Sequence, residues 1–309
     1  MNIKYNYNKK IENLIENQIF ITGFTRSGTS IFSLLMGSLD NALLSFEPMM
    51  INLLLSFQNN SKKELSALYK SYFFEDFYLS YKNGRNYNFN TDDDSNISKY
   101  KSKNYITKSL SNSKRRFELI ENLKNDERII IKCANIFFDN KKLNDFSIRN
   151  LIIMIRQPDD VLKSVIKKKW LGNKYSKKGY TKSYKEINKE KVPFHINRNE
   201  LKFWKSLNNY ERCCWEIKKF NEMIFKLKIR GLTIVDYDDF CKRPNLFFHY
   251  FKKLYRLKET KKSREILRTI KPLKKENFNF EKYKNNLSSK LYYETIRSFK
   301  KIHQRRLIF

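Results

Sequence analysis

Apolar and polar positions follow one another along the chain in blocks that predict strands followed by helices. Residues 19–22 form an apolar run of strand length, which leads through a glycine-bounded turn into a segment from Thr29 with helical spacing. Residues 128–133 and 150–155 are β-branched apolar runs, as in buried parallel strands. This alternation predicts a three-layer α/β fold, with a central parallel sheet covered by helices on both faces.

The same pattern predicts the later elements. A helix is expected from Pro158, and residues 201–224 have the spacing of one long helix that Gly231 would end. Residues 232–236 then form another strand, and a further helix starts at Pro244.

Other segments are expected outside the sheet. Ser61 and Glu64 have the spacing of a capping box, which would start an aromatic-rich helix running to about Lys82. The polar residues 84–104 and the Lys-rich residues 171–199 are expected to be surface insertions, the second of them a loop.

Length and composition limit the class of protein. The 309 residues suit one large domain, spanning residues 1–309. The most apolar stretch, residues 41–57, contains Glu47 and Pro48, so no membrane span is expected. The N-terminus is charged rather than signal-like, which predicts a cytoplasmic location.

Cysteines and charge add two expectations. The four cysteines have no metal-site or redox-motif spacing, so buried reduced thiols are expected. The formal net charge of +32 would favour nucleic acid, an anionic membrane or an acidic substrate. An AT-rich gene would explain about half of this excess, because Lys, Asn, Ile, Tyr and Phe are abundant together.

The turn after the first strand has the pattern of an anion-binding loop. Residues 23–30 fit G-x-x-x-x-G-x-[ST], a spacing at which backbone N–H groups and a helix N-terminus surround a phosphate-like group. Thr29 occupies the position of the lysine found in nucleotide triphosphatases, and the positive charge lies at Arg26 instead. This loop is suited to a terminal oxyanion handled without a metal, such as sulfate.

A second candidate anion site follows the strand at residues 150–155. Arg156 lies at the carboxyl end of that strand, where open α/β sheets bind ligands, and Ser164 lies eight residues later. An arginine fork and a serine hydroxyl could share one phosphate.

The two motifs together resemble the sulfotransferase superfamily, whose donor is 3′-phosphoadenosine 5′-phosphosulfate (PAPS). TRSGTS resembles the family's phosphosulfate loop, and Arg156, Pro158, Asp160 and Ser164 match its R-x-P-x-D-x-x-x-S segment for the 3′-phosphate. The resemblance implies a P-loop NTPase-like sulfotransferase fold and a metal-independent enzyme. The residues that it assigns to the donor are Arg26, Ser27, Gly28, Thr29, Ser30, Arg156 and Ser164.

The resemblance also suggests catalytic residues and an acceptor. Glu47, in an E-P pair, matches the base of carbohydrate sulfotransferases, and Pro48 is expected to hold its backbone extended. Lys132 matches a family lysine, and with Arg26 it would stabilise the leaving oxygen. The Gly-containing basic segment of the cytosolic small-molecule branch is not found. The carbohydrate branch, with an anionic or polar glycan as acceptor, is therefore expected.

Rival interpretations remain for the site and the function. His195 is an alternative base, although a lone loop histidine is more often solvated. A P-loop kinase or NTPase would have to bind ATP with magnesium, which Thr29 disfavours. A nucleic-acid binder would exploit the net charge, but the basic residues are spread along the chain, so no nucleic-acid partner is expected.

Overall fold

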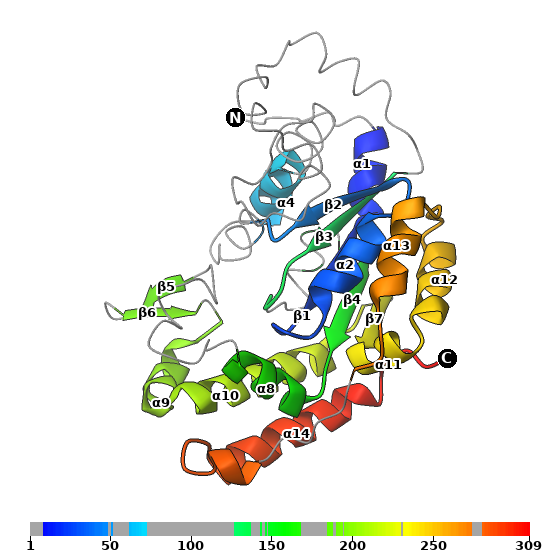
Figure 1. The fold of residues 1–309 in the computed structure, drawn as a ribbon. Coiled ribbons are helices and arrows are strands. Elements are labelled where there is room, and N and C mark those ends of the chain that lie inside the picture. The colour runs from blue at the N-terminus through cyan, green and yellow to red at the C-terminus, as the bar shows by residue number, and fades with distance from the viewer. Residues whose placement is uncertain are drawn as a thin grey trace, which may run out of the picture.

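The computed structural model describes residues 9–48, 51, 62–72, 127–136, 143, 146, 148–167, 184–187, 190–193, 195–229, 231–273 and 280–309. Within them, a five-stranded parallel sheet lies between helices (Figure 1). Its strands are β1 (Ile19–Gly23), β2 (Ala42–Phe46), β3 (Arg128–Lys132), β4 (Asn150–Ile155) and β7 (Gly231–Asp236). The predicted three-layer α/β fold is confirmed.

The central strand of the sheet is β1. The strand order is β2-β3-β1-β4-β7, so the chain crosses from one side of β1 to the other between β3 and β4. Every residue of β1 is buried, with Phe20 in one core and Ile19 and Ile21 in the other. This burial on both faces is why the first strand has no polar alternation.

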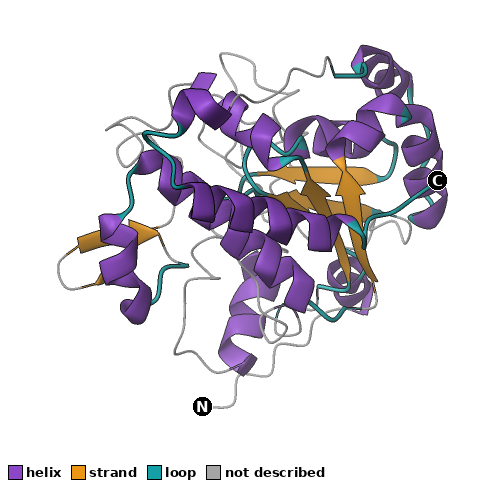
Figure 2. Cartoon of the chain, turned by 90° about the horizontal axis from the view of Figure 1, so that it is seen from below, coloured by secondary structure: helices purple, strands orange, loops and turns teal. Residues whose placement is uncertain are grey.

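Two groups of helices cover the two faces of the sheet, and Figure 2 shows the strands between them. The helices packed on the Phe20 side are α1 (Lys9–Glu16), α4 (Lys62–Ser71), α8 (Pro158–Lys167), α10 (Asn209–Lys226) and α14 (Ser289–His303). Those on the other side are α2 (Thr29–Gly37), α11 (Tyr237–Lys242), α12 (Pro244–Leu254) and α13 (Lys261–Thr269). A short 3₁₀ helix, η5 (Phe280–Tyr283), precedes α14.

The described part of residues 171–199 contains a hairpin, so the prediction of a loop is wrong there. β5 (Tyr184–Ile187) pairs with β6 (Glu190–Pro193) in antiparallel fashion, and η4 (Arg198–Glu200) and α9 (Leu201–Ser206) follow. These elements form a small third core against α10. Each strand of the hairpin buries one apolar residue, Ile187 in β5 and Val192 in β6. Among so many lysines, this pattern was too weak to predict strands.

The single long helix expected over residues 201–224 is two helices, α9 and α10. Leu207 is extended between them, and the Asn208 side chain accepts the N–H groups of Tyr210 and Glu211. The Glu211 carboxylate in turn accepts the Asn208 N–H at 3.2 Å. This capping box starts a new helix, and continuous apolar spacing had concealed the interruption.

The prediction that Gly231 ends the long helix is wrong, because Gly231 is the first residue of β7. The helix ends at Lys226, and Leu227 is already extended. A Cβ at Gly231 would lie 2.0 Å from the Arg149 carbonyl oxygen, so glycine permits close approach of the neighbouring strand.

Several predictions fall on residues outside the described part of the chain. They are the Ser61 half of the capping box, the continuation of that helix to Lys82, and the insertion at residues 84–104. Among the described residues, no helix combines the length and apolar character needed to cross a membrane. All four cysteines are buried without a disulfide, as predicted.

Candidate functional site

The predicted donor-binding and catalytic residues come from the carboxyl ends of β1, β2, β3 and β4 and from the helices α2 and α8. β1 pairs with β3 on one side and β4 on the other, and all three strands are parallel. The loop after β1 therefore lies where the direction of chain crossing changes, which is the usual ligand position in open α/β sheets.

The loop between β1 and α2 makes a tight turn that needs unusual backbone angles. Arg26 has a φ of 66° and Gly28 a φ of 85°. A Cβ at Gly28 would lie 2.0 Å from the Tyr237 ring, so only glycine fits between the loop and α11. Ser27 closes the turn, because its N–H and its buried hydroxyl both donate to the Phe24 carbonyl.

The backbone N–H groups at the N-terminus of α2 lie next to the loop. Gly28 is the N-cap residue and has no side chain that could accept the N–H groups of the first turn. Thr29, the first helical residue, is buried, whereas Ser30 is exposed. This arrangement can receive an anion through the donors and the positive end of the helix dipole.

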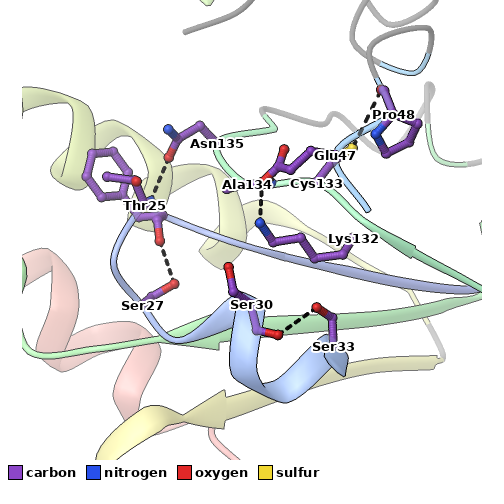
Figure 3. Close-up of polar contacts among 11 residues, drawn as sticks. Thr25, Ser27, Ser30, Ser33, Glu47, Pro48, Lys132, Cys133, Ala134 and Asn135 are labelled. Atoms are coloured by element: carbon purple, nitrogen blue, oxygen red, sulfur yellow. Dashed lines mark hydrogen bonds and ion pairs between the residues drawn. The ribbon is translucent and has the colours of Figure 1, made fainter. Parts of the chain in front are cut away.

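Asn135, which was not among the predicted site residues, holds the loop from the β3 side. Its N–H donates to the Gly23 carbonyl at 2.9 Å, and its Oδ1 accepts the Thr25 N–H at 2.7 Å (Figure 3). Asn135 has a φ of 58°, a conformation that asparagine adopts more readily than most residues. The only sequence signal was an asparagine shortly after a buried strand.

Glu47 and Lys132 form an ion pair at the ends of β2 and β3. The Lys132 amino group donates to Glu47 Oε1, and Figure 3 shows the two side chains directed at each other. The Ala134 N–H lies 3.3 Å and 3.4 Å from the two carboxylate oxygens. The Lys132 side chain is 4% exposed and that of Glu47 is 22% exposed, so the carboxylate remains the more accessible partner.

The predicted extended backbone at Glu47 is wrong. Its φ is 50°, in the left-handed region, and its N–H donates to the Lys132 carbonyl at 2.7 Å. Pairing with β3 therefore outweighs the usual preference of a residue before proline. The resulting turn directs the Glu47 carboxylate back to Lys132 and Ala134.

Arg26, Arg156 and Ser164 meet on the β4 side of the loop. Arg26 Nε donates to Ser164 Oγ at 2.8 Å, and Arg156 Nη1 donates to the Arg26 carbonyl at 3.2 Å. The buried Nε of Arg156 has no hydrogen-bond acceptor in the described part of the chain, since Asp160 Oδ2 is 4.0 Å away. A buried donor of this kind suits an anionic ligand.

The ring of Tyr237, which was not among the predicted site residues, lies beside both Gly28 and Arg156. Tyr237 starts α11 directly after β7, and its ring centroid lies 5.2 Å from the Arg156 guanidinium. Burial raises the pKa of the Tyr237 phenol to about 12, so the hydroxyl is protonated at neutral pH.

His195 does not join these residues. It packs in the third core, where Nε2 lies 3.4 Å from the buried Glu216 carboxylate and the ring stacks on Trp215. The expectation of a solvated side chain is also wrong, because only 8% of it is exposed.

Comparisons with known proteins find similarity to solved structures only. No protein-family model matches the chain, and no curated protein does. The Sulfotransferase Domain from the Curacin Biosynthetic Pathway is 15% identical, with 93% of this chain and 97% of that one covered and a TM-score of 0.48. The Sulfotransferase Domain from the Synechococcus PCC 7002 Olefin Synthase is 12% identical, with 93% and 94% covered and a TM-score of 0.43.

A third similar structure is the Sulfotransferase from Alicyclobacillus acidocaldarius. It is 8% identical, with 94% of this chain and 96% of that one covered and a TM-score of 0.42. Because so few residues are shared with these structures, the function proposed below rests on the geometry of this chain's own residues.

Proposed function

We propose that the chain transfers a sulfuryl group from PAPS to a hydroxyl group of a carbohydrate. One observation carries the proposal: the loop after β1 lies between Arg156 with Ser164 on one side and the Glu47–Lys132 pair on the other. A donor with an anionic group at each end of its ribose needs two anion sites, and a reacting oxygen needs a base and a cation nearby.

The loop and α2 would hold the phosphosulfate end of the donor. The backbone N–H groups at the start of α2 and the hydroxyls of Thr29 and Ser30 would supply hydrogen bonds and a positive helix end, while Ser27 shapes the turn by donating to the Phe24 carbonyl. Thr29 replaces the lysine on which a nucleotide triphosphatase relies, which favours a sulfate donor over a metal-bound triphosphate.

Arg156 and Ser164 would hold the 3′-phosphate. The buried Arg156 Nε lacks an acceptor among the described groups, and a phosphate oxygen would satisfy it. This N–H group of Arg156 is the feature by which the chain's own residues fit the nucleotide. The cosubstrate supplies the activated sulfuryl group.

Glu47 and Lys132 would carry out the chemical step. As the acceptor oxygen bonds to sulfur, its proton passes to the Glu47 carboxylate, and the bond from sulfur to the bridging phosphate oxygen breaks. Lys132 both stabilises the ionised carboxylate and supplies positive charge for the departing phosphate. Arg26 was predicted to share the second role.

The acceptor is proposed to be a hydroxyl of an anionic or polar glycan. A net charge of +32 would attract an acidic chain over long range and would make the apparent KM rise with salt. A sugar hydroxyl is a poor nucleophile at neutral pH, which is why the carboxylate base is needed.

The direct test is a transfer assay with two labelled donors. The protein is incubated with a panel of polysaccharides and either ³⁵S-labelled PAPS or γ-³²P-labelled ATP with magnesium. We expect label transfer from PAPS alone, and its loss in Lys132→Ala. Phosphate transfer from ATP, with none of sulfate, would overturn the proposal in favour of a kinase.

A further inference from the structure

We propose that Arg306 is a positioning residue of the nucleotide site: through Asp239 it holds α11, and with it the Tyr237 ring, against the loop after β1. The inference rests on the proposed function. It extends that function to residues 304–309, which follow α14 and were not among the predicted site residues.

Tyr237, the first residue of α11, is the point at which this helix meets the site. A Cβ at Gly28 would lie 2.0 Å from the Tyr237 ring, and the centroid of the same ring is 5.2 Å from the Arg156 guanidinium. Gly28 has a φ of 85°, so the loop is packed against the ring in a conformation that favours glycine. A shift of α11 would therefore loosen the packing beside the loop and beside Arg156 together.

The first turn of α11 is held by two carboxylates. The helix has six residues, and a helix of this length depends on tertiary contacts. The Asp236 carboxylate caps it locally, accepting the N–H groups of Asp238 and Asp239 at 2.9 Å and 3.0 Å. The Asp239 carboxylate accepts Arg306 Nε at 3.0 Å. This second bond joins the helix to a segment that is 67 positions away in the chain.

Arg306 reaches Asp239 from a backbone that is itself fixed. Its Nη1 donates to the His303 carbonyl at 3.0 Å, and the N–H of the next residue, Leu307, donates to the Ile234 carbonyl at 2.8 Å. Ile234 lies in β7, the strand at one edge of the sheet, so residues 304–309 cover part of that edge. The side chains of Arg306 and Asp239 are 24% and 19% exposed, so their ion pair is partly shielded from water.

The same segment is anchored on α12 as well. The Phe309 ring packs edge-on against Phe247 and Tyr250, with centroids 4.8 Å and 5.2 Å apart. Arg243, directly after the last residue of α11, donates from Nη1 to a main-chain oxygen of Phe309 at 2.6 Å. Figure 1 shows the end marked C beside α12. The segment therefore contacts α11 in its first turn and again just beyond its last, which fits a role in holding this helix in place.

The first test is hydrogen–deuterium exchange of the protein without ligand. In Arg306→Ala we expect faster exchange in residues 237–242 and in the loop at residues 24–28, because α11 loses its bond to the segment, with exchange in β1 unchanged. Arg297→Ala, at an exposed position of α14, removes the same charge and should exchange like wild type. Unchanged exchange of α11 and the loop in Arg306→Ala would overturn the inference.

The second test is calorimetry with adenosine 3′,5′-bisphosphate. Arg306→Ala should weaken binding about 3- to 10-fold, the range of one charge-assisted hydrogen bond in a partly exposed pair. Arg306→Lys should recover part of this loss, because an ammonium can still pair with Asp239. In a Tyr237→Leu background, which lacks the ring, Arg306→Ala should lower the affinity by less than about twofold. Equal losses in the two backgrounds would overturn the inference.

Failure of the inference and failure of the proposed function can be told apart. Wild-type protein without preference for the bisphosphate over adenosine 5′-monophosphate would overturn the proposed function, whereas the exchange experiment still tests whether Arg306 holds α11. If Arg306→Ala does not fold, as checked by circular dichroism, Asp239→Asn keeps the shape of the partner without its charge. It should show the same faster exchange and weaker binding. Folded Asp239→Asn with wild-type exchange and affinity would overturn the inference.

Discussion

The β3 side and the β4 side of the loop hold their cations in different ways. On the β3 side, Lys132 is nearly buried and paired with the Glu47 carboxylate. On the β4 side, Arg26 and Arg156 contact uncharged oxygens, the Ser164 hydroxyl and the Arg26 carbonyl, and Asp160 lies 4.0 Å from Arg156. The first side is balanced in charge, whereas the second keeps a donor facing no acceptor in the described chain.

This difference suggests a division of labour at one sheet edge. A preformed carboxylate–ammonium pair can exchange a proton and stabilise a leaving group, but it gains little by binding another anion. The Arg156 Nε, which has no hydrogen-bond acceptor among the described residues, would gain a charge-assisted bond from a phosphate. We therefore expect variants on the β3 side to change turnover and variants on the β4 side to change nucleotide affinity.

The largest effect is expected on the β3 side. Glu47→Gln keeps the shape and removes the base, so turnover should fall by about 10²–10⁴-fold while nucleotide affinity persists. Sulfate transfer and calorimetry on the same preparation would measure both. Glu16→Gln, an exposed carboxylate paired with Arg149, is the matched control. Full activity in Glu47→Gln would mean that the base is a different group.

The next largest effect is expected for Arg156→Ala, which should weaken nucleotide binding on the β4 side. Removing a desolvated charge partner should cost about 2–5 kcal/mol of binding to adenosine 3′,5′-bisphosphate, because the phosphate loses the fork. Arg149→Ala, at the opposite end of β4 and largely exposed, should leave the affinity unchanged. Calorimetry that gave equal affinities for Arg156→Ala and wild type would remove Arg156 from the nucleotide site.

A smaller effect is expected at Asn135, which holds the loop from the β3 side. Asn135→Gly keeps the left-handed backbone and the N–H bond to Gly23 but removes the acceptor for the Thr25 N–H. One lost hydrogen bond predicts a decrease of about 0.5–1.5 kcal/mol in nucleotide binding. Asn135→Asp keeps an oxygen at this position and should bind better than Asn135→Gly; the reverse order would contradict the role of Oδ1.

The smallest effect is expected for the hydrogen bond that joins α14 to the first turn of α8. The Tyr292 hydroxyl on α14 donates to Asp159 Oδ1 at 2.7 Å, and burial raises the pKa of Asp159 above its usual value while this bond lowers it. Tyr292→Phe should therefore raise that pKa further and cost about 1 kcal/mol of stability at pH 7.

The stability deficit of Tyr292→Phe should depend on pH with a definite sign. The bond favours the ionised carboxyl, so the deficit of Tyr292→Phe should be largest above the pKa of Asp159 and shrink as the pH falls through it. Urea unfolding at pH 7 and pH 4 measures this difference. A deficit that grew on acidification would contradict the assignment.

The sequence predicted the parts of the site that depend on local pattern. β1, the glycine-bounded turn and α2 follow from an apolar run, two glycines and helical spacing, and Arg156 follows from the end of a second apolar run. These features are encoded within a few neighbouring residues, so no knowledge of tertiary contacts was needed.

The parts that could not be predicted depend on long-range contacts. Asn135 acts through bonds to Gly23 and Thr25, more than a hundred residues earlier, and Tyr237 acts through its ring against Gly28. The backbone of Glu47 was mispredicted because pairing with β3 overrode the local effect of Pro48. His195 was misjudged because its burial depends on Trp215 and Glu216, which lie on α10.

The central claim is that two anion sites on this sheet edge bind the two ends of one nucleotide. It is tested most directly by calorimetry of the wild-type protein in a chelating buffer, with adenosine 3′,5′-bisphosphate and adenosine 5′-monophosphate in parallel. We predict that the bisphosphate binds at least about tenfold more tightly, a difference of about 1.4 kcal/mol, without any divalent metal. Equal affinities, or binding of the bisphosphate only when magnesium is added, would contradict the account.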